Sequence, residues 1–152
     1  MTIPIIVPAL HQAQDNAGIF RGTHRMITQL KFVSIPTRDQ ARALRFYTEQ
    51  LGFQVSTDQP FDGTQRWIEL RVANSATRVV LFTPPGHEDR IGSFFNGSFA
   101  CDDVEQTYRQ LSERGVEFRG PPEKQPWGTY AVFKDPEGNL LEIYADSSPD
   151  AK

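Results

Sequence analysis

Two carboxylates alternate with aromatic residues in segments typical of strands, and they are the side chains best suited to binding or acid–base chemistry. Glu142 lies in NLLEIYA, and Glu69 lies in QRWIELRV. A carboxylate held among Phe82, Tyr130 and Tyr144 would be partly desolvated and positioned to exchange a proton with a ligand. Glu142 is therefore the first candidate for a general base, or for a group that fixes a hydroxylated or cationic ligand.

Glu69 belongs to the first half of the chain, in which one strand, one helix and three strands follow one another. ITQLKFVSI alternates as a strand, and a helix then begins at Thr37 or Asp39 and runs to about Leu51, with Gly52 after it. Leu44 and Leu51 belong to its expected buried stripe. The strands that follow are FQVST, QRWIELRV and RVVLFTP, separated by turn-forming residues.

The same order recurs in the second half of the chain. SFFNGSFAC is extended, Asp102 or Asp103 caps a helix that Gly115 closes, and VEFRG, TYAVFKD and NLLEIYA follow. Asp103 comes 64 residues after Asp39, and Gly115 comes 63 residues after Gly52. This repeat predicts an α+β fold of two tandem βαβββ modules, residues 26–84 and 93–146, that form a curved mixed sheet around a cleft. Residues 1–25 would be an N-terminal extension and residues 147–152 a C-terminal tail.

Strand alternation predicts which side chains face the cleft. Ile35, Ile68, Leu70 and Leu81 would pack under the helix, because they alternate with the residues of the opposite face. Trp127 in QPWG is expected at the rim. The predicted ligand-binding residues, beside Glu142, are Phe32, Ser34, Trp67, Glu69, Phe82, Asn96, Ser98, Trp127, Tyr130 and Tyr144. A lining rich in rings with a few polar groups is typical of a small-molecule pocket, although the same rings could form a closed core.

Three segments resemble the vicinal oxygen chelate superfamily of glyoxalases, bleomycin-resistance proteins and extradiol dioxygenases. RFYTEQLGF at 45–53 is similar to the first-helix signature, FACDDVEQTYRQLSERGVEF at 99–118 to the second helix, and QPWGTYAVFKDPEGNLLEIY at 125–144 to the closing hairpin. The resemblance covers about residues 26–146. It implies a glyoxalase/bleomycin resistance-like fold and a homodimer, since bleomycin-resistance members share their clefts between subunits.

The metal ligands that the resemblance implies are largely missing from this sequence. They fall on Phe32, Val80, Asn96 and Glu142, and only Glu142 has a side chain that commonly binds a metal. The three histidines, His11, His24 and His87, lie in the extension and in the segment that joins the modules. We therefore predict no metal site and no cofactor, although a tail or loop that folded over the cleft could supply ligands for a divalent metal.

Three functions remain open at this stage. The first is binding or sequestration of a small aromatic or hydrophobic molecule, as in bleomycin-resistance members. The second is a glyoxalase-like lyase or isomerase, or a dioxygenase-related enzyme, with Glu142 as base or as ligand of an unconventional metal site. The third is a scaffold without a ligand. Replacing Glu142 with Gln would separate the first two, because binding should largely survive this change and base catalysis should not.

Bulk composition narrows the choice of partner and compartment. The net charge of −3 and the absence of a basic stripe argue against nucleic acid. Pro4 and Pro8 interrupt the apolar start, so we expect neither a signal peptide nor a membrane span. Cys101 is the only cysteine, which fits a reducing cytoplasm and an inert thiol.

Overall fold

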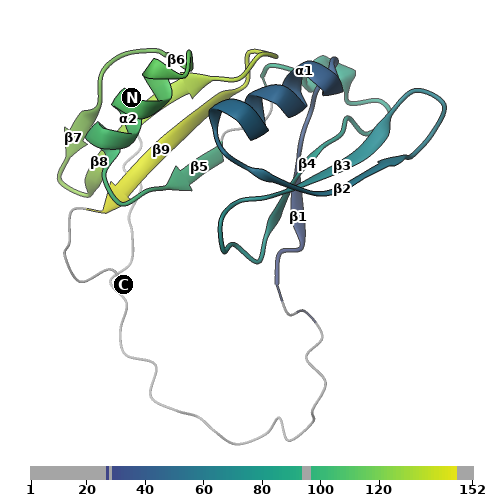
Figure 1. Ribbon diagram of the computed structural model, residues 1–152, viewed down its shortest axis with the longest axis horizontal. Coiled ribbons are helices and arrows are strands. Elements are labelled where there is room, and N and C mark those ends of the chain that lie inside the picture. Colours follow the sequence, from purple (N-terminus) through teal and green to yellow (C-terminus); the bar gives the residue numbers. More distant parts are fainter. Residues whose placement is uncertain (1–26, 28, 94–96, 147–152) are drawn as a thin grey trace, which may run out of the picture.

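The described part of the chain forms two modules that lie side by side (Figure 1). The computed structural model describes residue 27 and residues 29–93 and 97–146. The first module consists of β1 (Phe32–Ile35), α1 (Gln40–Arg45), η1 (Phe46–Gln50), β2 (Gln54–Pro60), β3 (Arg66–Arg71) and β4 (Arg78–Leu81). The second consists of β5 (Gly97–Ala100), α2 (Val104–Glu113), β6 (Glu117–Phe118), β7 (Glu123–Gln125), β8 (Gly128–Lys134) and β9 (Leu140–Asp146), and η2 (Glu88–Arg90) lies between the modules.

The two modules repeat one strand order, which confirms the predicted fold class. The order is β1-β4-β3-β2 in the first sheet and β5-β9-β8-β6 in the second. In each sheet the first and last strands of the module are parallel neighbours, with Ser34 opposite Val80 and Ser98 opposite Glu142. The second sheet also contains β7, which pairs with β8 and which the sequence patterns did not predict.

The helices begin and end where the sequence predicts. The side chain of Asp39 accepts a hydrogen bond from the backbone N–H of Arg42, and that of Asp103 accepts one from Gln106. α1 continues as a turn of π-helix, η1, and Gly52 follows it with φ of +78°. Within the described residues, no helix is long and apolar enough to cross a membrane.

One hydrophobic core joins the helix-facing sides of both sheets. Ile68 and Leu70 of β3 are fully buried, and they alternate with the residues of the opposite face. The modules meet through ring contacts, with Phe46 and Phe133 at 6.4 Å and Phe53 and Phe99 at 5.3 Å between centroids. The core is thus continuous from the first module to the second.

A buried carboxylate, that of Asp135, connects the modules at the turn between β8 and β9. It accepts hydrogen bonds from the Tyr47 hydroxyl at 2.8 Å, the Asn139 side chain and backbone at 2.9 Å, and the Glu137 backbone at 2.9 Å. Asn139 also donates to the carbonyl of Pro36 at 3.2 Å and is fully buried. Since Tyr47 and Pro36 belong to the first module, this network fixes the position of one module relative to the other.

Glu137 adds a second connection between the modules at the start of α1. Its Oε1 accepts hydrogen bonds from the backbone N–H groups of Arg38 at 2.9 Å and Asp39 at 2.7 Å. These N–H groups precede the first helical turn, where a negative charge also interacts favourably with the helix dipole. The turn DPEGN therefore holds both a strand and the start of α1 in place.

We predict that Tyr47→Phe destabilises the protein, because it removes a donor from a buried carboxylate. The expected loss in the free energy of unfolding is about 1–3 kcal/mol. Tyr108 is half-buried and its hydroxyl has no hydrogen bond among the described residues, so Tyr108→Phe is the matched control. Urea denaturation of the three proteins measures the difference, and equal losses in both variants would contradict the role of the network.

We predict that the buried Tyr47 hydroxyl makes the protein less stable at alkaline pH. Burial, followed by the charge of Asp135, raises the pKa of Tyr47 well above the ordinary value of 10.0. The folded protein therefore holds this proton where the unfolded chain releases it, and the contribution to stability is lost as pH rises above 10.0 toward the folded-state pKa. We expect the slope of stability against pH in this range to be smaller in Tyr47→Phe, and an unchanged slope would refute the assignment.

Candidate functional site

Four rings form an aromatic group on the outer face of the first sheet. Phe32 of β1 contacts Trp67 of β3 at 5.2 Å, and Trp67 contacts Phe82 at 5.4 Å. Phe61, which follows β2, lies 4.9 Å from Phe82 and 5.9 Å from Trp67. We call these four residues the first-sheet aromatic group. Phe61 and Phe32 remain 57% and 38% exposed, so the group offers rings to a ligand.

Two positions of this face are buried. Val80 is fully buried, and Phe82, itself one of the four rings, is only 7% exposed. Phe61 and Trp67 contact Phe82, so the more exposed rings of the group cover it. Phe61 escaped sequence analysis because it lies in a turn rather than a strand, and an aromatic residue in DQPFDG was its only signal.

The predicted polar residues of the first sheet occupy one row across three strands. Ser34, Val80 and Glu69 are in register on β1, β4 and β3. The Oε1 of Glu69 lies 3.8 Å from the Nε of Arg78, and both side chains are largely buried. The charge of Glu69 is therefore balanced by a neighbouring cation within the protein.

Three rings form the second-sheet aromatic group: Trp127, Tyr130 and Tyr144. Trp127 stacks on Tyr130 at 5.4 Å and on Tyr144 at 5.9 Å, with planes inclined by 21° and 29°. Its indole is 56% exposed, as expected for the rim. Gly128 allows this stack, because a Cβ there would lie 2.5 Å from the Tyr144 ring.

Both tyrosine hydroxyls of this group donate to carboxylates. Tyr130 donates to Glu123 at 2.8 Å, and Tyr144 donates to Asp146 and to the carbonyl of Trp127, the latter at 3.1 Å. The hydrogen bond to Glu123 raises the pKa of Tyr130, and the hydrogen bond to Asp146 raises the pKa of Tyr144. Both hydroxyls therefore keep their protons.

Glu142 lies on the same face of the second sheet. It is half-buried and in register with Ser98 of β5 and Val132 of β8. Among the described residues it has no hydrogen bond or salt bridge, so its carboxylate remains available to a ligand. Ser98 is exposed. Asn96 lies outside the described residues.

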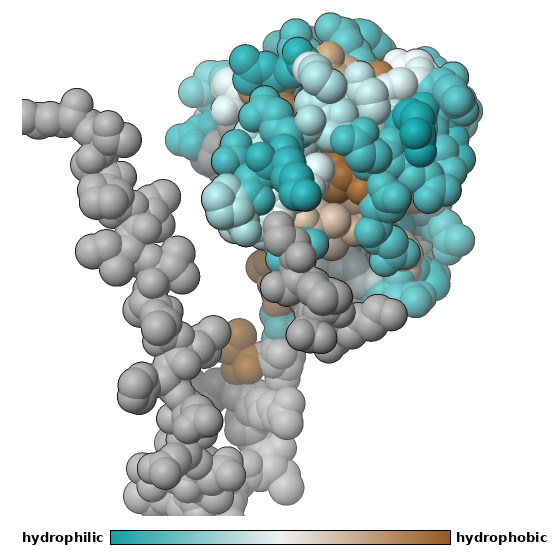
Figure 2. Space-filling view, turned by 90° about the vertical axis from the view of Figure 1, so that its left-hand side faces the viewer, coloured by the Kyte–Doolittle hydropathy of each residue, from teal (hydrophilic) through white to brown (hydrophobic). Residues whose placement is uncertain are grey.

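The predicted site residues thus fall into two groups on different sheets. Every ring contact of the seven rings, among the described residues, lies within its own group. The reason is that the modules meet through the opposite, helix-facing sides of their sheets. Figure 2, which views the molecule from the side of β7 and β8, shows a mostly hydrophilic surface around a small hydrophobic area.

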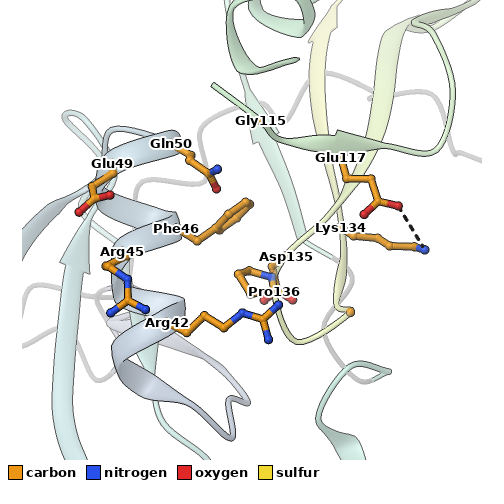
Figure 3. A pocket seen from close by; sticks show the side chains of 11 residues that line it. Arg42, Arg45, Phe46, Glu49, Gln50, Gly115, Glu117, Lys134, Asp135 and Pro136 are labelled. Atoms are coloured by element: carbon orange, nitrogen blue, oxygen red, sulfur yellow. Dashed lines mark ion pairs between the residues drawn. The ribbon is translucent and has the colours of Figure 1, made fainter. Parts of the chain in front are cut away.

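A cavity of about 580 Å³ lies elsewhere, between α1 and the second module (Figure 3). Its lining carries three basic residues, Arg42, Arg45 and Lys134, and three acidic residues, Glu49, Glu117 and Asp135. Lys134 and Glu117 approach to 3.9 Å, and the dashed line in Figure 3 marks this pair. None of the predicted site residues lines this cavity, and its balanced charges favour no particular ligand.

The residues at the family's metal positions do not fit a metal ion. Phe32 has no donor atom, Val80 is apolar and buried, and Glu142 is a single carboxylate. No cluster of three or more histidine, cysteine or acidic side chains could hold a metal within the described residues. His87 is exposed beside η2, and His11 and His24 lie outside the described residues. Burial raises the pKa of the Cys101 thiol, which disfavours the reactive thiolate.

The repeated strand order defines a tandem βαβββ protein, and each of its two sheets carries an aromatic group on its outer face. The chain belongs to the Glyoxalase/Bleomycin resistance protein/Dioxygenase superfamily, whose model matches residues 29–143. This confirms the resemblance drawn from the helix and hairpin motifs.

One of the proteins that this chain resembles is an antibiotic binding protein. The chain is 35% identical to the uncharacterized protein YetH of Bacillus subtilis, over 76% of this chain and 97% of YetH. It is 35% identical to TnmS3, an antibiotic binding protein from Streptomyces sp. CB03234, covering 82% of this chain and 100% of TnmS3 with a TM-score of 0.72. A superfamily member from Sphaerobacter thermophilus is 32% identical, with coverage of 79% and 98% and a TM-score of 0.70.

We predict that Gly128→Ala disrupts the second-sheet aromatic group. The added Cβ would lie 2.5 Å from a Tyr144 ring atom and 2.6 Å from the Ala145 carbonyl oxygen, so the ring must move. Near-UV circular dichroism should change, and thermal stability should fall. Gly63→Ala is the control, because a Cβ there meets nothing within 4 Å. An unchanged near-UV spectrum in Gly128→Ala would contradict the stacked arrangement.

Proposed function

We propose that this protein binds a small aromatic or hydrophobic molecule between its two aromatic groups and sequesters it without chemical change. The observation that carries the proposal is the exposure of two aromatic groups on faces that the core does not use. Stacking on such rings contributes about 0.5–1.5 kcal/mol for each pair, in addition to the burial of apolar area. The similarity to the antibiotic binding protein TnmS3 supports this class of ligand. We expect the protein to act in the cytoplasm.

We further propose that the binding cleft forms in a homodimer. The first-sheet aromatic group of one chain would face the second-sheet aromatic group of its partner, because the two groups have no ring contact with each other among the described residues of one chain. A two-fold axis then produces two equal clefts, each with one wall from each chain. Burying the exposed rings in this way would also remove apolar surface from water.

The alternative proposal is an enzyme that uses Glu142 as a general base, or as ligand of an unconventional metal site. Its supporting observation is the half-buried carboxylate of Glu142, which has no hydrogen bond among the described residues. The reaction would then be a glyoxalase-like lyase or isomerase step. Replacing Glu142 with Gln separates the proposals, since sequestration keeps most of its affinity and base catalysis is lost.

The proposed function predicts that a single ring substitution in either wall weakens binding. A panel of planar aromatic compounds, anthraquinones and acridines included, is first tested for an increase in melting temperature. For the compound that binds, Trp67→Leu and Trp127→Leu should each weaken affinity about tenfold, or about 1.4 kcal/mol, measured by calorimetry. Val55→Ala is the control, because Val55 is exposed away from both groups. No binding by any compound would contradict the proposal.

A mixed dimer tests whether the cleft is shared. When a Trp67→Leu chain pairs with a Trp127→Leu chain, a shared cleft leaves one site with both substitutions and one site intact. The purified mixed dimer should therefore recover one site of wild-type affinity. A cleft within each chain would leave one damaged wall in every site, so the absence of any recovered site would contradict the shared cleft. Light scattering establishes the mass of each species.

A further inference from the structure

Building on the proposed function, we infer that the ligand carries a positive charge and that the second-sheet aromatic group binds it. Three stacked rings present their faces or edges beside carboxylates on this wall, whereas on the first wall the carboxylate of Glu69 is paired with Arg78. The proposed ligand class is therefore a planar or apolar molecule with a protonated amine or quaternary nitrogen.

The rings themselves are suited to a cation. Trp127 is the most exposed member, at 56%, and an indole is the side chain that binds cations most strongly through its π face. The stack places Tyr130 and Tyr144 within 6 Å of the indole centroid, at 5.4 Å and 5.9 Å. A cation that rests on this surface can therefore contact more than one ring.

The hydrogen bonds of the tyrosines strengthen this preference. Each hydroxyl donates to a carboxylate, Tyr130 to Glu123 and Tyr144 to Asp146. Donation to an anion increases the electron density of the phenol ring, and the adjacent carboxylate adds its own negative potential. Because the hydroxyl protons are already used, these tyrosines have little capacity to donate to an anionic ligand.

Glu142 supplies a third carboxylate, and it has no ion pair among the described residues. It lies opposite Val132, one step along the same face from the pair of Tyr130 and Tyr144, so its carboxylate adds negative charge beside both rings. Arg119 is a cation on the neighbouring segment, where its backbone N–H donates to the carbonyl of Val132, and the residue is exposed to solvent. The carboxylates beside the three rings are those of Glu123, Asp146 and Glu142.

A cavity of about 320 Å³ lies directly beside these groups. Its lining includes Arg119, Glu123, Tyr130 and Val132. It offers room for a substituent of the ligand next to a carboxylate and a ring. The first wall differs in charge, since Glu69 is paired with Arg78. The difference assigns the apolar body of the ligand to the first wall and its cationic group to the second.

Two probes of the same shape test this inference. N-methylacridinium is a permanent cation, whereas acridine is neutral in neutral buffer. Calorimetry on the full-length protein should give an affinity for N-methylacridinium about tenfold higher than for acridine. Glu142→Gln should reduce this preference about threefold, because it removes the negative charge that acts on the cation. Glu113→Gln, an exposed carboxylate at the end of α2, should leave the preference unchanged.

The outcomes separate this inference from the proposed function. Equal affinity for the two probes would overturn the cationic ligand and leave aromatic binding intact. A preference that Glu142→Gln does not alter would overturn the assignment to the second wall. Failure to bind either probe while another compound of the aromatic panel binds would overturn this inference alone, whereas failure of the whole panel would overturn both. Added salt provides an independent readout, since only the cation should lose affinity as ionic strength rises.

Discussion

The buried carboxylate of Asp135 is the constraint on which the arrangement of the molecule depends. It accepts hydrogen bonds from Tyr47 of the first module and from Asn139 of the second, and Asn139 also binds the Pro36 carbonyl. A buried charge without these donors would be costly, so the two modules must keep one relative position. That position joins the helix-facing sides of both sheets into one core and leaves both aromatic groups on outer faces.

This geometry leaves one aromatic group on the outer face of each of the two repeated sheets. Each sheet presents one wall, and the two walls differ in charge: Glu69 is paired with Arg78 on the first, whereas Glu142 has no ion pair among the described residues of the second. At the family's metal positions, Phe32 now belongs to a ring cluster and Val80 to the layer beneath it. The superfamily fold is thus retained, while at these two positions apolar side chains stand where a chelating member would need donor atoms.

The local part of this structure could be predicted from the sequence. The helix ends were predictable from the capping residues Asp39 and Asp103 and from Gly52, because such signals act within one turn of the chain. Strand alternation likewise placed Ile68 and Trp67 on opposite faces of the sheet, because it depends only on neighbouring residues. Contacts between distant segments were beyond these rules: the pairing of Glu69 with Arg78, the ring of Phe61 from a turn, and the short β7 all depend on tertiary packing. The separation of the two aromatic groups follows from the Asp135 network, which no local pattern encodes.

We propose that this superfamily member binds its ligand without a metal. The metal content of the purified protein tests this proposal most directly. The protein would be purified without a metal-affinity tag, incubated with Zn²⁺, Ni²⁺, Fe²⁺ and Mn²⁺ in turn, desalted, and subjected to elemental analysis at known concentration. We predict metal far below one equivalent per chain in every case, with ligand binding unaffected by a chelator. Near-stoichiometric metal that is lost in Glu142→Gln would contradict the claim and would favour the lyase, isomerase or dioxygenase alternative.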